Sequence, residues 1–147
     1  MKICDKQLPA YFQFANHAIG EECFEYGPST KCLANLDDHG NIRAVVVYDR
    51  ITDYDCMMHI ASDGTKNWMS RQYLVMAFHV PFVQWGLRRV TGLVKAGNEQ
   101  ALSFDKHLGF VQEGVIRCGF GDCDGILLGM LKEECRFLNR KYYGREK

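Results

Sequence analysis

The segment 98–110 constrains the fold of this chain more than any other part of the sequence. It reads Asn-Glu-Gln-Ala-Leu-Ser-Phe-Asp-Lys-His-Leu-Gly-Phe and follows Val90–Val94, a short apolar run that contains β-branched residues. Asn98 is a suitable N-cap residue and an acidic residue follows it, so a helix is expected from about Glu99 to Leu108. Gly109 supplies the left-handed conformation in which such helices end. A strand, a helix and a second strand are therefore predicted here.

The remaining hydrophobic pattern predicts one domain of the α/β (α+β) class that spans residues 1–147. No internal repeat, low-complexity tract or linker interrupts the chain. A first helix is expected after Pro9, with Gly20 as its stop. The other expected elements are strands at Lys31–Leu36, Ile42–Tyr48 and Asp55–Ala61, a helix from about Ser70 to Trp85 that bends at Pro81, and a last strand at Ile126–Leu131.

The charge balance excludes a strong general attraction to polyanions. Lysine plus arginine equals aspartate plus glutamate at 18 residues each, so no global field draws nucleic acid or an anionic membrane surface. No apolar run approaches the length of a membrane span, and residues 1–6 lack the apolar core of a signal peptide. We therefore expect a cytoplasmic protein without a membrane partner; a local basic groove for nucleic acid remains open.

The cysteines favour a reduced protein without a metal site. Seven cysteines, an odd number, occur without a Cys-x-x-Cys pair, which argues against a disulfide framework and against a zinc knuckle. Most are expected to be small buried hydrophobic residues. Cys118 and Cys123 border a glycine-rich turn and are close enough in sequence to meet, but two reduced thiols are the interpretation that a reducing compartment favours.

A set of residues in and after the predicted 99–108 helix forms a family pattern: Asn98, Ala101, Leu108, Gly109, Phe110, Glu113 and Gly114. This pattern resembles the second half of the GNAT family of acetyl-CoA-dependent N-acyltransferases. The resemblance extends to Lys132–Leu138, a closing segment often seen in bacterial and phage-encoded members. It implies the GNAT fold, which is a mixed, mostly antiparallel central sheet with splayed central strands flanked by helices. It also implies acetyl-CoA as acyl donor and, for a phage-encoded chain, the cytoplasm of a bacterial host.

The turn before the long helix is the expected coenzyme A site. A helix N-terminus offers unpaired N–H groups and the positive end of the helix dipole, so it can hold a pyrophosphate. In the family this turn reads Arg or Gln, two variable residues, Gly, one variable residue, then Gly or Ala. At the same length those three positions are Thr65, Trp68 and Ser70, which depart from that pattern. The resemblance implies cofactor contacts at Ile60, Ala61, Thr65, Lys66, Asn67, Trp68, Met69, Ser70 and Arg71.

The helix 99–108 carries further positions of the resemblance. Asn98 often contacts the pantetheine arm in the family, although its role as N-cap is sufficient to explain it, and Phe104 completes the expected cofactor contacts. Seven residues after Asn98, many members place a tyrosine that protonates the leaving thiolate; here that position is Asp105. A carboxylic acid donates a proton near neutral pH only if burial or a nearby anion raises its pKa. Lys106 or solvent are the alternatives.

His59 is the candidate general base. Acyl transfer needs a neutral amine, because only the lone pair attacks the thioester carbonyl, and histidine titrates near neutrality. Strand alternation places Asp55 on the same face, where it would orient or supplement His59. A satisfied core histidine is the alternative. Backbone N–H groups around Ile60 and Ala61 are expected to polarise the acetyl carbonyl.

The acceptor is expected on the other side from the cofactor, near residues 14–26 and 117–124. Acidic residues in these segments would attract a cationic amine. They are Glu21, Glu22, Glu25, Asp122 and Asp124. A small-molecule amine, a protein amine and an aminated nucleobase all remain open as acceptors. A homodimer is expected from the fold.

Two functions from different classes follow from the sequence. The first is an acetyl-CoA-dependent N-acyltransferase in which a primary amine attacks the thioester directly within a ternary complex. The second is a GNAT-fold binding module that has lost transfer, such as a protein-interaction or virion-associated component. The altered turn at Thr65, Trp68 and Ser70 and the missing tyrosine at Asp105 favour the second reading.

Overall fold

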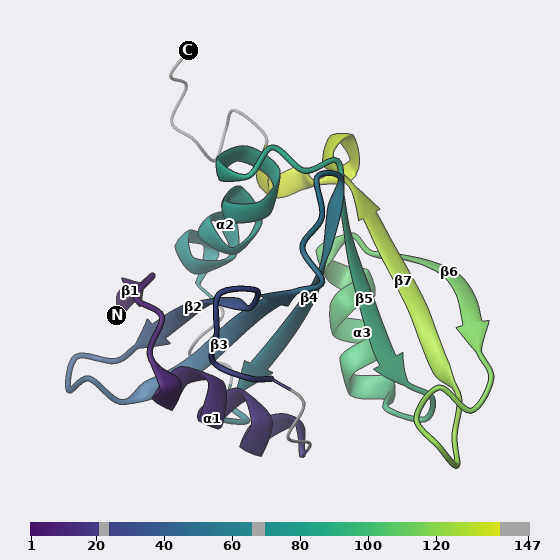
Figure 1. Ribbon diagram of the computed structural model, residues 1–147, viewed down its shortest axis with the longest axis horizontal. Helices are drawn as coiled ribbons and strands as arrows, with labels where there is room; N and C mark the ends of the chain where they lie inside the picture. The colour runs from purple at the N-terminus through teal and green to yellow at the C-terminus, as the bar shows by residue number, and fades with distance from the viewer. Residues whose placement is uncertain (21–23, 66–69, 139–147) are drawn as a thin grey trace.

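The computed structural model describes residues 1–20, 24–65 and 70–138 of the 147-residue chain. Seven strands form one sheet: β1 Lys2–Cys4, β2 Lys31–Leu36, β3 Ile42–Asp49, β4 Asp55–Ser62, β5 Arg89–Lys95, β6 Val111–Ile116 and β7 Gly125–Leu131. Their order across the sheet is β1-β2-β3-β4-β5-β7-β6 (Figure 1). Every neighbouring pair is antiparallel except β4 and β5, which are parallel. The mixed, mostly antiparallel sheet that the sequence predicts is thereby confirmed.

Helices cover both faces of the sheet, because side chains on successive strand residues point to opposite faces. Helix α1 (Pro9–Ile19) packs on one face, which we call the α1 face. The core between α1 and the sheet consists of Tyr11, Phe12, Ala15, Phe24, Cys32, Ala34, Val45, Val47 and Ala61. Helices α2 (Arg71–His79) and α3 (Glu99–Leu108) contribute to a larger core on the opposite face. No helix among the described residues is long and apolar enough to cross a lipid bilayer.

The ends of α1 and α3 are set by local sequence. Helix α1 begins with a proline in its first turn and ends at Gly20, which has φ 85°. The Asn98 side chain accepts a hydrogen bond from the Ala101 N–H at 3.2 Å, and Gly109 ends α3 with φ 119°. Both helices, including their caps, are confirmed as predicted.

The long helix predicted from about Ser70 to Trp85 is wrong in one respect. The α-helix ends at His79, and Val80–Gln84 form a π-helical turn in place of a bent α-helix. Pro81 lacks a backbone donor and crowds the preceding turn, so the regular ladder cannot continue through it. The Trp85 N–H instead donates to the Val80 carbonyl five residues earlier, at 3.0 Å.

Two elements at the ends of the chain were not predicted. Strand β1 lies along β2 at the edge of the sheet, and its three residues are too few for a strand pattern to be visible. After β7, residues 132–134 and 136–138 form two 3₁₀ turns. They bring the buried Phe137 ring against Phe78 of α2, with 5.2 Å between ring centroids. Strand β1 thus extends the sheet at one edge, and the segment after β7 packs against α2.

The described cysteines are free thiols. Cys32, Cys56 and Cys135 are buried, as expected for small hydrophobic residues, and burial raises the pKa of the Cys56 thiol to about 12. Cys118 and Cys123 in the β6–β7 loop are not joined by a disulfide.

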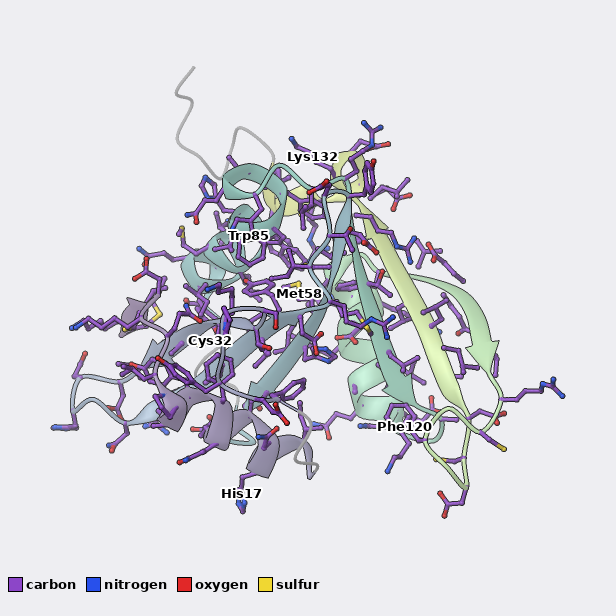
Figure 2. The ribbon with its side chains drawn as sticks, viewed as in Figure 1. His17, Cys32, Met58, Trp85, Phe120 and Lys132 are labelled. Atoms are coloured by element: carbon purple, nitrogen blue, oxygen red, sulfur yellow. The ribbon has the colours of Figure 1, made fainter. Side chains whose placement is uncertain are left out.

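The two central strands separate after a short common segment. Residues 55–57 of β4 pair with residues 89–91 of β5, and the strands then diverge (Figure 1). We call residues 58–62 of β4 and 92–95 of β5 the splay. Met58, the first β4 residue of the splay, is buried near the centre of the molecule (Figure 2). The prediction of splayed central strands is confirmed.

An ion pair links strands β5 and β6 across β7. Arg89 Nη2 lies 2.7 Å from Glu113 Oε1, and both side chains are about a third exposed (27% and 34%). The pair passes over Gly129 of β7: a Cβ added there would lie 2.6 Å from Arg89 Nη2 and would also collide with the Glu113 carboxylate. A glycine at this position therefore allows the pair to form.

We expect Gly129→Ala to break this ion pair at a small cost. Both colliding groups are the ends of flexible side chains and can move into solvent, so the free energy of unfolding should fall by less than about 1 kcal/mol, the usual range for a partly exposed pair. Urea unfolding of the native protein and of Gly129→Ala measures this loss. The same substitution in a Glu113→Ala background should cost less still; an equal or larger loss there would mean that the β7 backbone, and not the ion pair, is disturbed.

Candidate active site

The backbone of β4 presents polar groups to the splay. The Asp63 N–H donates to the Arg43 carbonyl at 2.9 Å, and this bond sets the alternation of the β3–β4 ladder. His59 and Ala61 therefore direct their backbone groups toward β3. Ile60 directs its N–H and carbonyl toward β5, whose pairing with β4 ends at Thr91. Of the two N–H groups expected to polarise the acetyl carbonyl, the Ile60 N–H therefore faces the splay. The Ala61 N–H faces β3.

The turn between β4 and α2 is described only in part. Lys66, Asn67, Trp68 and Met69, all expected cofactor contacts, lie outside the described residues. The Thr65 N–H and hydroxyl both donate to Asp63 Oδ1, at 2.9 and 2.6 Å. The other oxygen of this carboxylate accepts from Arg43 at 2.9 Å. Thr65 is therefore held by its own loop.

The first turn of α2 lies directly after this segment. Ser70 is the N-cap, and its Oγ accepts a hydrogen bond from the Tyr73 N–H at 3.1 Å. Arg71 is the first residue of the helix and is exposed. The Ser70 side chain thus accepts from one of the N–H groups in the first turn of the helix. The positive end of the helix dipole points toward the loop before α2. Ser70 and Arg71, two of the expected cofactor contacts, therefore lie at the start of α2.

Asp105 lies on the buried stripe of α3, in a position unusual for a carboxyl group. Its neighbours at helical spacing are the buried Leu102 and Leu108, and Phe104 beside it packs against the larger core. Burial raises the pKa of Asp105 from 3.8 to about 7. A large fraction of such a carboxyl group is protonated near neutral pH. The condition under which Asp105 can donate a proton is therefore met by its position in the fold.

His59 lies on the α1 face and is paired with a carboxylate that the sequence analysis did not identify. Its Nε2 is 2.8 Å from Asp49 Oδ1, and the Phe24 ring packs against the imidazole with 4.7 Å between centroids. Asp55, the expected partner, instead accepts a hydrogen bond from the Thr52 hydroxyl at 2.7 Å. The sequence analysis missed this pair because it depends on the register between two strands. His59 is opposite Val47 of β3, so Asp49 is its diagonal neighbour on the same face.

The candidate base and the candidate acid belong to opposite faces of the sheet. His59 is on the α1 face, and Asp105 is carried by α3, which is seen between the diverging β4 and β5 in Figure 1. The expected acceptor residues are more dispersed. Glu25 and Asp122 are exposed, and Asp124 accepts from the Cys118 N–H at 2.9 Å. Glu21 and Glu22 lie outside the described residues.

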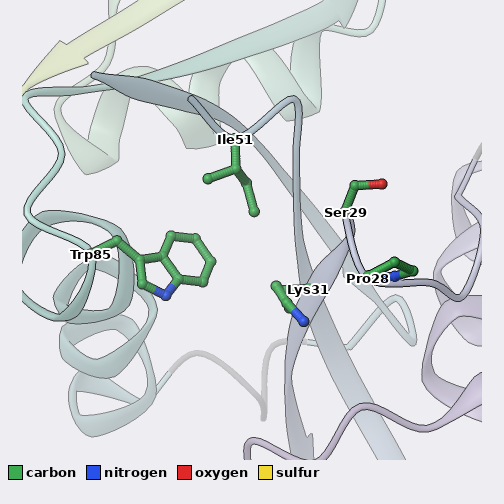
Figure 3. Close-up of a pocket in the computed structure, with 5 residues that line it drawn as sticks. All are labelled: Pro28, Ser29, Lys31, Ile51 and Trp85. Atoms are coloured by element: carbon green, nitrogen blue, oxygen red, sulfur yellow. The ribbon is translucent and has the colours of Figure 1, made fainter. Parts of the chain in front are cut away.

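None of the expected site residues lines a pocket found elsewhere on the molecule. It is lined by Pro28, Ser29, Lys31, Ile51 and Trp85 (Figure 3). Lys31 begins β2 and Ile51 follows β3, so this pocket is at the end of the sheet where β4 starts, away from the splay. Among the residues that the structure describes, no group of three His, Cys, Asp or Glu side chains is placed to hold a metal ion.

We expect Asp105→Asn to change how stability depends on pH. The folded-state pKa of Asp105 is raised, so between pH 3.8 and about 7 the folded protein binds more protons than the unfolded chain, and its stability falls as pH rises through this window. Asparagine cannot ionise, so the variant should lose this component and be more stable than the native protein above pH 7. Thermal unfolding between about pH 4 and pH 8 measures the effect. If stability depended on pH in the same way in both proteins, the raised pKa of Asp105 would be contradicted. Asp53→Asn, on an exposed loop, is the matched control.

Comparison with known proteins finds a shared fold over nearly the whole chain. No known protein family and no curated protein sequence matches it. A single-residue variant of the spermidine N-acetyltransferase SpeG from Vibrio cholerae has a TM-score of 0.74 and 15% identity over 96% of this chain and 99% of that chain. The Vibrio cholerae enzyme in complex with CoA and spermine has a TM-score of 0.74 and 14% identity over 94% and 98%. Identity this low establishes a likeness of fold, and the described chain accordingly has the GNAT fold of these acetyltransferases.

Proposed function

We propose that this protein is an acetyl-CoA-dependent N-acetyltransferase that transfers the acetyl group directly to a primary amine in a ternary complex. The observation that carries the proposal is the separation of the parallel strands β4 and β5 after three paired residues. It leaves the Ile60 N–H beside an opening in the middle of the sheet, where an acyl thioester would find a donor. The likeness to structures of spermidine N-acetyltransferases over nearly the whole chain supports it.

The donor would bind along the splay with its pyrophosphate at the start of α2. The α2 N-terminus supplies N–H groups, and Lys66 and Arg71 supply positive charge nearby in sequence. Asn98 and Phe104 of α3 would contact the pantetheine arm. The acetyl carbonyl oxygen would accept a hydrogen bond from the Ile60 N–H, which stabilises the negative charge that develops on this oxygen as the amine attacks.

The chemistry needs one proton acceptor and one proton donor. His59 would take a proton from the acceptor ammonium, directly or through water, and the amine lone pair would then attack the thioester carbon. As the carbon–sulfur bond breaks, the protonated Asp105 carboxyl would give its proton to the thiolate. The nitrogen that has attacked would lose its second proton to water, and Asp105 would regain a proton from water, so that one proton is released per turnover. The products are CoA with a free thiol and the N-acetylated amine. No covalent enzyme intermediate forms in this sequence.

We infer a small cationic amine as acceptor. The structural neighbours are named for spermidine, and one was solved with spermine. In this chain Asp49 and Asp55 place two partly buried carboxylates on the α1 face near the candidate base, where they attract positive charge. Protein amines and aminated nucleobases are the other acceptors to test.

Donor binding is tested by calorimetric titration with acetyl-CoA and with CoA. We expect dissociation constants in the micromolar range for both, and loss of binding when Lys66 and Asn67 are replaced by acidic residues, because like charge repels the pyrophosphate. Replacing Lys132, which is exposed and lies after β7 at the other end of the sheet, by glutamate is the control for added negative charge. If the native protein does not bind either compound, the proposal fails.

Transfer is tested by thiol release from acetyl-CoA with spermidine, spermine, a lysine peptide and an aminated nucleobase. We expect turnover with at least one polyamine and a fall in kcat on the order of 100-fold in Asp105→Asn and in His59→Gln, the usual scale for losing a general acid or base. Intersecting initial-velocity lines would indicate a ternary complex, and parallel lines would contradict it. Asp53→Asn should retain the native rate.

A second function is favoured by one observation. The Thr65 hydroxyl and N–H are both used by Asp63, at the position where the family pattern expects a residue that serves the pyrophosphate. A GNAT-fold binding module without transfer, including a virion-associated component, would explain this. Binding of acetyl-CoA without thiol release with any amine would favour the binding module.

A further inference from the structure

One carboxylate outside the predicted site residues contacts the candidate base. Asp49 is the last residue of β3, and its Oδ1 lies 2.8 Å from His59 Nε2. The Asp49 and His59 side chains are 25% and 19% exposed, so both are largely shielded while remaining reachable by water. Because His59 pairs with Val47, Asp49 is held at the diagonal position by the register of β3 and β4.

We propose that Asp49 is a positioning residue that fixes the tautomer of His59 and so decides which imidazole nitrogen takes the proton of the acceptor amine. This inference rests on the proposed function, because His59 acts as a base only if an amine is acetylated. Asp49 does not contact the reacting atoms in this role; it acts through the imidazole.

The chemistry of imidazole gives the direction of the effect. A neutral histidine carries one N–H, and a carboxylate can only accept, so Asp49 selects the form with hydrogen on Nε2. Nδ1 is then the nitrogen with the lone pair. When Nδ1 takes the proton from the ammonium, the imidazolium lies against the Asp49 carboxylate, which stabilises its charge. The proton leaves His59 for solvent after the amine has attacked.

The surroundings restrict both partners. The Phe24 ring packs on the imidazole at a tilt of 53°, which limits rotation of the His59 ring. Asp55, the nearby acid of β4, is hydrogen-bonded to Thr52. Arg89 on the same face donates to Glu113 and to Thr91. These two charged groups are thus engaged elsewhere, and the His59 ring is hydrogen-bonded to Asp49.

The test reads the tautomer directly by ¹⁵N NMR of the imidazoles, without substrate, at a pH where histidine is neutral. The chain has five histidines, and the His59 signals are assigned by their loss in His59→Gln. We expect native His59 to be protonated on Nε2. Asp49→Asn should move the population toward the Nδ1-protonated form, whereas Asp49→Glu, which keeps a carboxylate, should hold it in part. Asp53→Asn, an exposed change of the same kind four residues away, should leave the signals unchanged.

Kinetics provide the second readout. We expect Asp49→Asn to lower kcat on the order of 100-fold while leaving KM for acetyl-CoA unchanged, and Asp49→Glu to recover part of kcat. An active native protein whose tautomer or kcat is the same in Asp49→Asn would overturn this inference and leave the proposed function intact. A native protein that releases no thiol with any amine would overturn the proposed function, and the catalytic part of this inference with it.

Discussion

The parallel pairing of β4 with β5 stops after three residues on each strand. Beyond this point the backbone groups of the two strands that face each other need other hydrogen-bond partners. Backbone N–H and carbonyl groups in the middle of a sheet need partners. Those of Ile60 face the opening and are not used by β3. An extended molecule with amide groups of its own can supply the missing partners, as a neighbouring strand would. The pantetheine arm of coenzyme A is such a molecule.

Strand alternation then divides the chemistry between the two faces. His59 and Asp49 are odd-numbered residues on the α1 face, while α3 with Asp105 packs on the other side. A thioester in the splay would have a proton acceptor on one side and a proton donor on the other. Burial would be what allows Asp105 to act as that donor: the same carboxyl group in solvent would be ionised near neutral pH, whereas here its pKa is about 7.

The parts of the fold that local sequence determines were predictable. The ends of α3 follow from Asn98 and Gly109, whose effects reach only one turn of helix. The Asp49–His59 pair was not predictable, because it depends on the register between two strands, which the alternation within one strand does not give. The raised pKa of Asp105 likewise depends on how α3 packs, since its sequence neighbours Lys106 and His107 suggest an exposed turn. Local reasoning therefore gives the helix ends, whereas contacts between elements need the three-dimensional structure.

The π-helical turn at Val80–Gln84 has a consequence for the history of this chain. A π turn is equivalent to one residue inserted into an α-helix, so a relative lacking that residue would have an unbroken helix over the same span. The wider turn takes up the extra residue, so the chain on either side keeps its orientation about the helix axis. Trp85, whose ring meets the edge of Tyr48 with 5.2 Å between centroids, would keep that contact in such a relative. A length difference of one residue at this turn would therefore leave the wall at this end of the sheet unchanged.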